Sequence, residues 1–201
     1  THYCETHDVK LKTAEELEAH DNCVILTDRQ RSRRTNEGRR VSRRRLLTHV
    51  RALDEMLGSA EEPGYPPDDA VLIAGEPGCG KSTLCMWALS EMAHHGARVL
   101  YVSAEESAAQ VLNRATTTGY YHRGMRIIGA KQIHEILPVC AAVRPHAIVI
   151  DSVREMGVLG PYPKGGVRAV EAVANYAKGL ATRYQALVML VGHVTKANQI
   201  A

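Results

Sequence analysis

Hydrophobic residues divide the chain into two parts with different patterns. Up to residue 69 they are scattered among charged and turn-forming residues, and from residue 70 they occur as short continuous runs separated by helical periodicities. Short apolar runs bounded by polar residues are typical of strands buried on both faces. The predicted strands are 70–75, 98–103, 125–130, 146–151 and 186–193. The predicted helices are 81–95, 106–118, 131–143 (kinked at Pro138) and 167–184.

This alternation of strands and helices predicts an α/β fold, with a mostly parallel, doubly wound sheet. Upstream, residues 46, 50, 53 and 57 are apolar at helical spacing, and Gly58 is the expected helix stop. Residues 59–69 are turn-forming. Met86 and Trp87, on the helix 81–95, are expected in the core.

Composition narrows the class of protein. The chain has 201 residues, 45% of them hydrophobic, which is enough for one sizeable core. No apolar run reaches the ~18 residues of a membrane span, and no secretory signal pattern is present, so we expect a cytoplasmic protein with no membrane association. Five cysteines without pairing spacing argue against a disulfide framework.

The segment GEPGCGKST carries the most specific chemical signal. Residues 75–82 fit G-x-x-x-x-G-K-[ST] in full, between a strand and a helix, as a phosphate-binding loop requires. Lys81 is expected to reach the β- and γ-phosphates of a nucleotide, and Ser82 to hold Mg²⁺. An ordinary glycine-rich turn is the alternative. The other predicted binding positions of this loop are Gly75, Glu76, Pro77, Gly78, Cys79 and Gly80.

Carboxylates stand at the ends of two other predicted strands. Asp151 follows the run AIVI and is the candidate carboxylate for Mg²⁺; a turn cap is its alternative role. Glu105 and Glu106 follow RVLYVS, where a carboxylate would emerge at the same sheet edge to polarise water. Both can instead be helix-starting acids favoured by the helix dipole, and one can serve each role.

Four segments together resemble the RadA/Sms DNA-repair ATPases, within the RecA/DnaB/KaiC group of P-loop ATPases: GEPGCGKSTL, VLYVSAEESAAQVLNRA, AIVIDSV and VGHVTK. The resemblance covers residues 46–201. It implies that Lys81, Ser82 and Thr83 bind nucleotide, that Asp151 holds the metal, and that Glu105 is catalytic with Glu106 beside it. His193 would sense the γ-phosphate, unless it is simply satisfied by the backbone. DNA-binding loops would include Arg154, Lys164 and Lys196.

The chain also departs from the RadA pattern. It lacks the four-cysteine module at the start, the Lys-Asn-Arg-Phe-Gly motif and the Lon-like domain of that family. It begins with Thr1 and ends just past an apolar run, so we expect a divergent or partial relative. The expected domains are a zinc-binding module at 1–28, an arginine-rich linker at 29–45 and a RecA-like ATPase core at 46–201.

Cysteine and histidine form a symmetric set near the N-terminus. Two residues lie between Cys4 and His7 and two between His20 and Cys23, and twelve residues separate the pairs. Four thiolate and imidazole groups can close a tetrahedral Zn²⁺ site, and RadA proteins carry zinc in this position. An unmetallated acidic tail is the alternative, because residues 1–28 contain two lysines against seven acids, net −5.

The basic charge of the chain is confined to residues 29–51, which hold ten arginines and one glutamate, net +9. Such a block can neutralise the phosphates of a nucleic acid independently of its base sequence, or it can be a solvated linker. No aromatic residue lies in this segment, so backbone contact is a more plausible role than base stacking. The predicted DNA contacts here are Arg39, Arg40, Arg43, Arg44 and Arg45.

These features predict a DNA repair and recombination motor that hydrolyses Mg-ATP and binds single-stranded or branched DNA. The resemblance implies a ring-shaped homo-oligomer such as a hexamer, with ATP, Mg²⁺ and Zn²⁺ as cofactors. Two alternatives remain open. One is a KaiC-like regulatory ATPase that acts on protein partners. The other is a non-hydrolysing, nucleotide-sensing DNA-binding module.

Overall fold

The structure, a computed structural model, describes residues 2–4, 9–11, 25–27 and 45–193, and the chain divides into two compact units, Thr1–Arg44 and Arg45–Ala201. Within the first unit, three short strands form an antiparallel sheet in the order β2-β1-β3. Their bounds are β1 His2–Cys4, β2 Val9–Leu11 and β3 Ile25–Thr27.

The second unit is built on a five-stranded sheet in the order β4-β8-β7-β5-β6, with every pairing parallel. This confirms the predicted α/β fold with a parallel sheet, and each strand lies within one residue of its predicted bounds. The strands are β4 Ala70–Gly75, β5 Val99–Ser103, β6 Met125–Gly129, β7 Ala147–Asp151 and β8 Leu187–His193.

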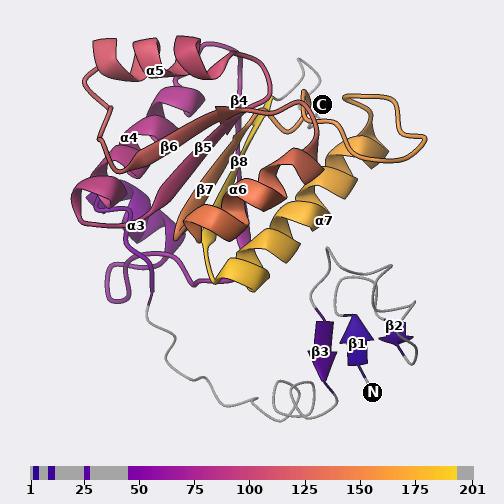
Figure 1. Cartoon of the computed structure of the whole chain (residues 1–201). Coiled ribbons are helices and arrows are strands. Elements are labelled where there is room, and N and C mark those ends of the chain that lie inside the picture. The colour runs from indigo at the N-terminus through magenta and orange to yellow at the C-terminus, as the bar shows by residue number, and fades with distance from the viewer. Residues whose placement is uncertain (1, 5–8, 12–24, 28–44, 194–201) are drawn as a thin grey trace. The chain divides into compact units, whose positions relative to one another are not determined.

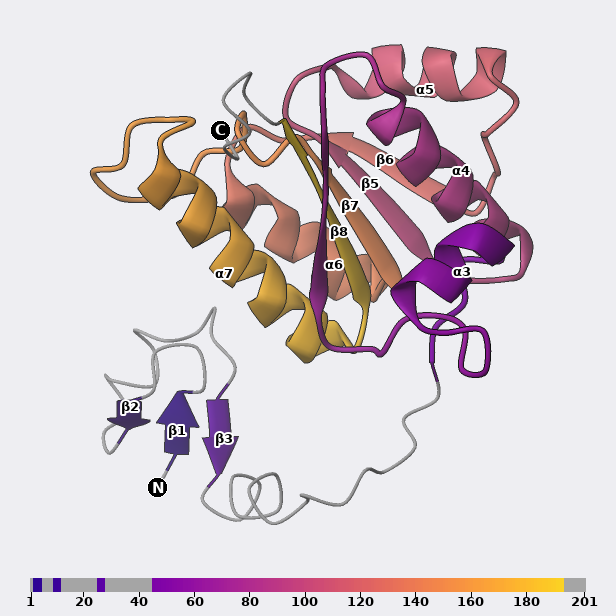
Figure 2. The same cartoon turned by 180° about the vertical axis from the view of Figure 1, so that it is seen from behind.

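Helices cover both faces of this sheet (Figures 1 and 2). One face carries α3 (Arg51–Leu57), α4 (Lys81–His94) and α5 (Ala108–Thr117). The other carries the 3₁₀ turn η1 (Ile133–Glu135), α6 (Ile136–Val143) and α7 (Val167–Tyr184). Among the helices described, none combines the length and apolarity needed to cross a membrane.

Alternate residues of the central strands enter two separate cores. Tyr101 and Val149 pack on the α4 and α5 side, whereas Leu100 and Ile148 pack on the α6 and α7 side. Because side chains alternate along a strand and both faces are covered, these strands must be apolar at every position. All four of these side chains are fully buried.

The helix predicted to begin near Leu46 starts only at Arg51. Leu46 instead forms an antiparallel bridge with Tyr65. The Asp54 carboxylate accepts hydrogen bonds from the backbone N–H groups of Thr48 (2.7 Å) and His49 (3.0 Å), which hold the chain in a turn before the helix. The helical spacing of the apolar residues was therefore misleading at its first position, and correct from residue 50 onward.

Two further expectations need revision. The helix predicted over 131–143 is divided into η1 and α6, so Pro138 lies in the first turn of α6, where a missing N–H leaves no intrahelical bond unmade. Met86 is buried as expected, but Trp87 is 37% exposed. Its indole Nε1 donates to Glu91 one turn later (3.3 Å), and its ring stacks against Tyr120 at the surface of α4.

Candidate nucleotide site

The loop between β4 and α4 is an open curve of backbone. Gly78 and Gly80 have φ values of 80° and 90°, in the left-handed region that glycine adopts without strain. A Cβ built on either glycine would meet no heavy atom within 4 Å, so both positions border open space. That space lies at the N-terminus of α4, where free N–H groups and the helix dipole favour phosphate oxygens.

Lys81 places its charge across this loop. Its side chain is largely buried, and Nζ donates to the carbonyls of Gly75 (2.9 Å) and Glu76 (2.8 Å). Ser82 is half-buried and Thr83 is exposed, both in the first turn of α4. Of the remaining loop residues, Pro77 and Cys79 are exposed, and the Cys79 thiol lies 3.8 Å from the Lys81 ammonium.

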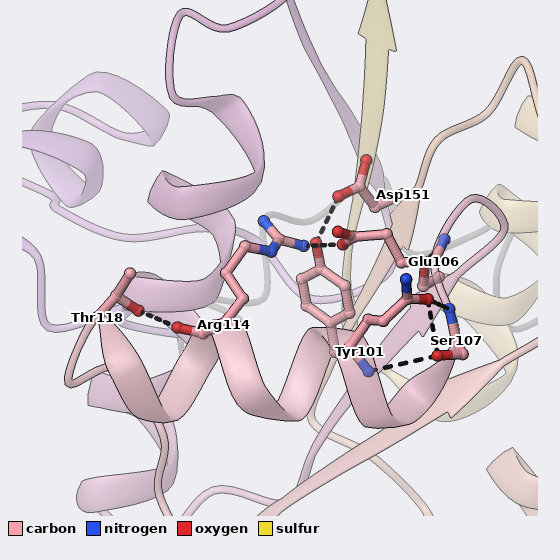
Figure 3. A network of polar contacts seen from close by, with 8 residues as sticks. Tyr101, Glu106, Ser107, Arg114, Thr118 and Asp151 are labelled. Carbon is pink, nitrogen blue, oxygen red and sulfur yellow. Dashed lines mark hydrogen bonds and ion pairs between the residues drawn. The ribbon is translucent and has the colours of Figure 1, made fainter.

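Asp151 ends β7 beside the same helix. It is 8% exposed, and its register partners are Ser103 on β5 and Val191 on β8. Burial, and secondly the charge of Asp151, raises the pKa of the Cys85 thiol on α4 to about 12, which indicates that the carboxylate lies close to that helix. The Tyr101 hydroxyl donates a hydrogen bond to Asp151 Oδ2 (Figure 3).

The side chains that could hold Mg²⁺ are of the right chemical type. A hydroxyl from Ser82 and a carboxylate from Asp151 are both hard oxygen donors, and Mg²⁺ at nucleotide sites is held by few protein groups plus the phosphates. Across residues 45–193 the structure contains no group of three or more His, Cys, Asp or Glu side chains placed to bind a metal. So sparse a donor set fits an ion shared with a nucleotide.

The two adjacent glutamates point to different partners. Glu105 Oε1 accepts a hydrogen bond of 2.5 Å from the Ser152 hydroxyl, at the end of β7. Glu106 Oε2 accepts from Arg114 Nη2 at 2.6 Å, over the first turns of α5 (Figure 3). Glu105 is thus turned toward the strand ends at the centre of the sheet, and Glu106 toward a helix on its face.

His193 ends β8, which pairs with β7. Its Nε2 lies 3.7 Å from Glu105 Oε1, and 27% of its side chain is exposed. In the parallel pairing with β4, His193 is the register partner of Gly75, the first residue of the phosphate loop. The structure therefore brings Lys81, Asp151, Glu105 and His193 to one edge of the sheet.

The predicted DNA-binding residues have mixed positions. Arg45 is tied into the fold, because its guanidinium donates to the carbonyls of Gly64 (2.9 Å) and Leu57 (3.3 Å). Arg154 is exposed, and Lys164 pairs with Glu155 at 2.8 Å. The other predicted DNA contacts lie outside the described residues: Arg39, Arg40, Arg43, Arg44 and Lys196.

The loop after β7 is anchored at its start and exposed beyond. Val153 and Met156 are buried, and Gly157 exchanges backbone hydrogen bonds with residues 131 and 133. Leu159 and Val167 are 74% and 69% exposed. Of the predicted zinc ligands, Cys4 is described only as a backbone position on β1, and His7, His20 and Cys23 lie outside the described residues.

Three residues of this site were not predicted from the sequence: Tyr101, Arg114 and Ser152. Tyr101 was counted only as part of an apolar strand, although a phenol in such a strand must bring its hydroxyl to a partner. Arg114 lies about two helical turns after Glu106. The spacing of the two residues does not predict that the Arg114 side chain reaches back to the start of the helix and pairs with Glu106. Ser152 could not be predicted because its hydroxyl donates to Glu105, a residue far from it in the sequence.

Comparisons with known proteins agree with these features. The KaiC ATPase family matches residues 46–126. The DNA repair protein RadA of Mycolicibacterium smegmatis is 38% identical over 159 residues, which cover 77% of this chain and 33% of that protein. RadA of Escherichia coli K12 is 33% identical over 158 residues, 78% of this chain and 33% of the relative. The chain thus spans about a third of the length of the curated relatives it matches.

Proposed function

Because this chain is a P-loop ATPase related to the RadA proteins, we propose that it forms the ATPase part of a DNA repair protein that hydrolyses Mg-ATP and acts on single-stranded or branched DNA. One observation carries the proposal most strongly. A lysine in a phosphate loop, a carboxylate at the end of β7 and a second, partly exposed carboxylate share the edge of the sheet where the parallel strands end. Phosphoryl transfer needs these three groups in one place.

Each residue then has a defined role. The amides of residues 78–83 and the Lys81 ammonium bind the β- and γ-phosphates and neutralise their charge. Ser82 and Asp151 hold Mg²⁺, which when bound adds positive charge at the same phosphates. Glu105 orients the attacking water and accepts its proton, with its carboxylate held in place by Ser152. Glu106 is occupied by Arg114 and does not serve as the base.

The experiment compares Glu105→Gln with Glu106→Gln. Glu105→Gln should bind ATP like the parent and lose at least about 100-fold in turnover, the size of effect typical of a general base. At saturating Mg²⁺, Glu106→Gln should keep most of the turnover, because it loses the ion pair with Arg114 and not the proposed base.

Two results would count against this assignment. Full turnover in Glu105→Gln together with loss in Glu106→Gln would move the base by one residue. Parental chain that binds ATP tightly and never turns it over would favour the nucleotide-sensing module instead.

The DNA part of the proposal draws on the relatives, which are named as DNA repair proteins, and on the exposed loop between β7 and α7, which ends at residue 166. A regulatory ATPase acting on protein partners is the second candidate, favoured by the KaiC family match. Single-stranded DNA should stimulate turnover in the first case. In the second case turnover should be the same with and without DNA.

Assembly and zinc complete the proposal. We also propose that the chain assembles into a ring of identical subunits such as a hexamer, as its resemblance to the RadA family implies, and light scattering with ATP present measures the assembly. Zn²⁺ bound by Cys4, His7, His20 and Cys23 stays a prediction from ligand spacing. Metal analysis of chain purified without chelator should give one Zn²⁺ per chain.

A further inference from the structure

The carboxylate of Asp151, the proposed Mg²⁺ ligand, belongs to a polar network. The other members of this network do not bind ATP or Mg²⁺ in the proposal above. The network consists of Tyr101, Asp151, Arg114 and Glu106, contributed by β5, β7, α5 and the loop before α5 (Figure 3). Tyr101 and Asp151 are buried, whereas the side chains of Arg114 and Glu106 are 31% and 41% exposed. Such a network costs free energy to bury unless its groups satisfy one another.

Tyr101 is the central residue of β5 and is fully buried. Burial, followed by the nearby Asp151 charge, raises the pKa of its phenol, so the hydroxyl stays protonated and donates. Its acceptor is Asp151 Oδ2, which fixes the rotation of the carboxylate about its last bond. A carboxylate fixed in this way presents its other oxygen in one direction only.

Arg114 closes the network from the other side. Its Nη2 donates to Glu106 Oε2 at 2.6 Å, and its charge acts on both the Tyr101 hydroxyl and Asp151. The helix that carries it is pinned at its start by a capping box, in which Ser107 and Gln110 bind each other's backbone groups. Glu106 and the capped helix therefore hold the guanidinium beside the phenol.

We propose that Tyr101 and Arg114 are positioning residues for the Mg²⁺ site: they fix the Asp151 carboxylate, and they do so without touching ATP or the metal. The proposal rests on the assignment of Asp151 as a metal ligand. It also gives Glu106 a reason to stand beside Glu105, since Glu106 anchors Arg114. Groups that orient a metal ligand from behind typically change metal affinity by about 10- to 100-fold when removed.

The test measures how nucleotide binding depends on Mg²⁺, using a fluorescent ATP analogue titrated with the metal and, separately, in EDTA. Tyr101→Phe keeps the ring in the core and removes only the hydroxyl. The Mg²⁺ concentration that gives half of the metal-dependent change in ATP-analogue binding (the Mg²⁺ midpoint) should rise by about tenfold. The affinity for the analogue in EDTA should stay unchanged. Tyr65→Phe, a buried tyrosine near the Leu46 bridge, is the matched control and should keep the parental midpoint.

Arg114 supplies the second variant, in case Tyr101→Phe does not fold. Its side chain is 31% exposed, so Arg114→Gln should be tolerated, and it should shift the Mg²⁺ midpoint in the same direction. Arg114→Lys, which keeps the charge, should restore part of the shift.

A parental Mg²⁺ midpoint in folded Tyr101→Phe or in Arg114→Gln would overturn the proposal. Loss of affinity in EDTA by the same factor would also overturn it, because that result marks a general structural defect. Failure of the parental chain to respond to Mg²⁺ at all would reject the metal assignment itself, and is distinguishable from both.

Discussion

At the scale of single residues, Gly75 shows how little room the phosphate loop leaves at its first position. Its backbone is not in the left-handed region, so conformational freedom is not the reason for glycine there. A Cβ would instead lie 2.9 Å from the Cys79 sulfur and 3.6 Å from Lys81 Cδ. Glycine is needed because the loop folds back over its own first residue.

We therefore expect Gly75→Ala to weaken ATP binding by about tenfold or more, since overpacking typically costs about 1–3 kcal/mol. The double variant with Cys79→Ala removes the atom in the way and should recover part of the affinity. We would titrate ATP calorimetrically into the parent, the two single variants and the double variant. The four affinities give the coupling free energy between positions 75 and 79. Strictly additive effects would show that the sulfur is not the obstacle.

At the scale of elements, the segment before β4 depends on one buried acid. Asp54 is 5% exposed and accepts three hydrogen bonds, from the N–H groups of Thr48 and His49 and from the Thr48 hydroxyl. Asp54→Ala leaves the buried Thr48 donors without an acceptor. The free energy of unfolding should fall by about 2–4 kcal/mol, measured by chemical denaturation.

Glu55 is the matched control for this prediction, one residue further along the same helix. Its side chain is 40% exposed and pairs with Arg51 across one helical turn. Exposed pairs of this kind contribute little, so Glu55→Ala should change the free energy of unfolding by less than about 0.5 kcal/mol. Equal losses in the two variants would mean that Asp54 does not organise the turn.

At the scale of the whole molecule, stability should depend on a stack of histidines. The rings of His49 and His95 are stacked with centroids 3.6 Å apart. Burial, and then the nearby His95, lowers the pKa of His49, while Asp54 and Glu91 act in the opposite direction. A histidine with a lowered pKa takes up a proton more readily when the chain unfolds, so acid favours unfolding.

The contribution of His49 is complete above its ordinary pKa of 6.5 and is lost as the pH falls through its lower folded value. His49→Gln should therefore flatten the fall in unfolding free energy between pH 7.5 and pH 5.5. Denaturation curves at both pH values measure it, with His122→Gln as a control that leaves the stack intact. His146, whose pKa is also lowered by burial, accounts for some remaining slope. An unchanged slope in His49→Gln would exclude the stack as the cause.

DNA binding is a second property of the whole molecule, and the structure sharpens how it should be tested. Arg45 supports the fold through Gly64 and Leu57, so it is kept, and only Arg39, Arg40, Arg43 and Arg44 are replaced by glutamine. Affinity for single strands of any sequence should fall. The slope of log affinity against log salt should flatten by up to about 3, because each lost phosphate contact removes about 0.7. If the variant kept the slope of the parental chain, the arginine-rich segment would be a linker and not a DNA contact.

The sequence was most informative where physical constraints are local. The phosphate loop and the strand ends at Asp151 and Glu105 follow from glycine, charge and apolar runs that are adjacent in the chain. The directions of Glu105 and Glu106 could not be predicted, because they depend on Ser152 and Arg114, which meet them only through the sheet order and the folding back of α5. The misplaced start of α3 has a local origin instead: the Asp54 carboxylate, inside the helix, holds residues 48 and 49 in a turn, and apolar spacing does not report that contact.

The last rung of the β4–β8 ladder has a mechanical consequence. Gly75 opens the phosphate loop, and its partner His193 is the last residue of β8. Among the strands that the structure describes, β4 stands at the end of the five-stranded sheet and pairs with β8 alone. We therefore expect a displacement of the loop by a phosphate to reach the main chain at His193 through this backbone pairing. Replacing the His193 side chain should leave that path in place, because the pairing is made by the main chain.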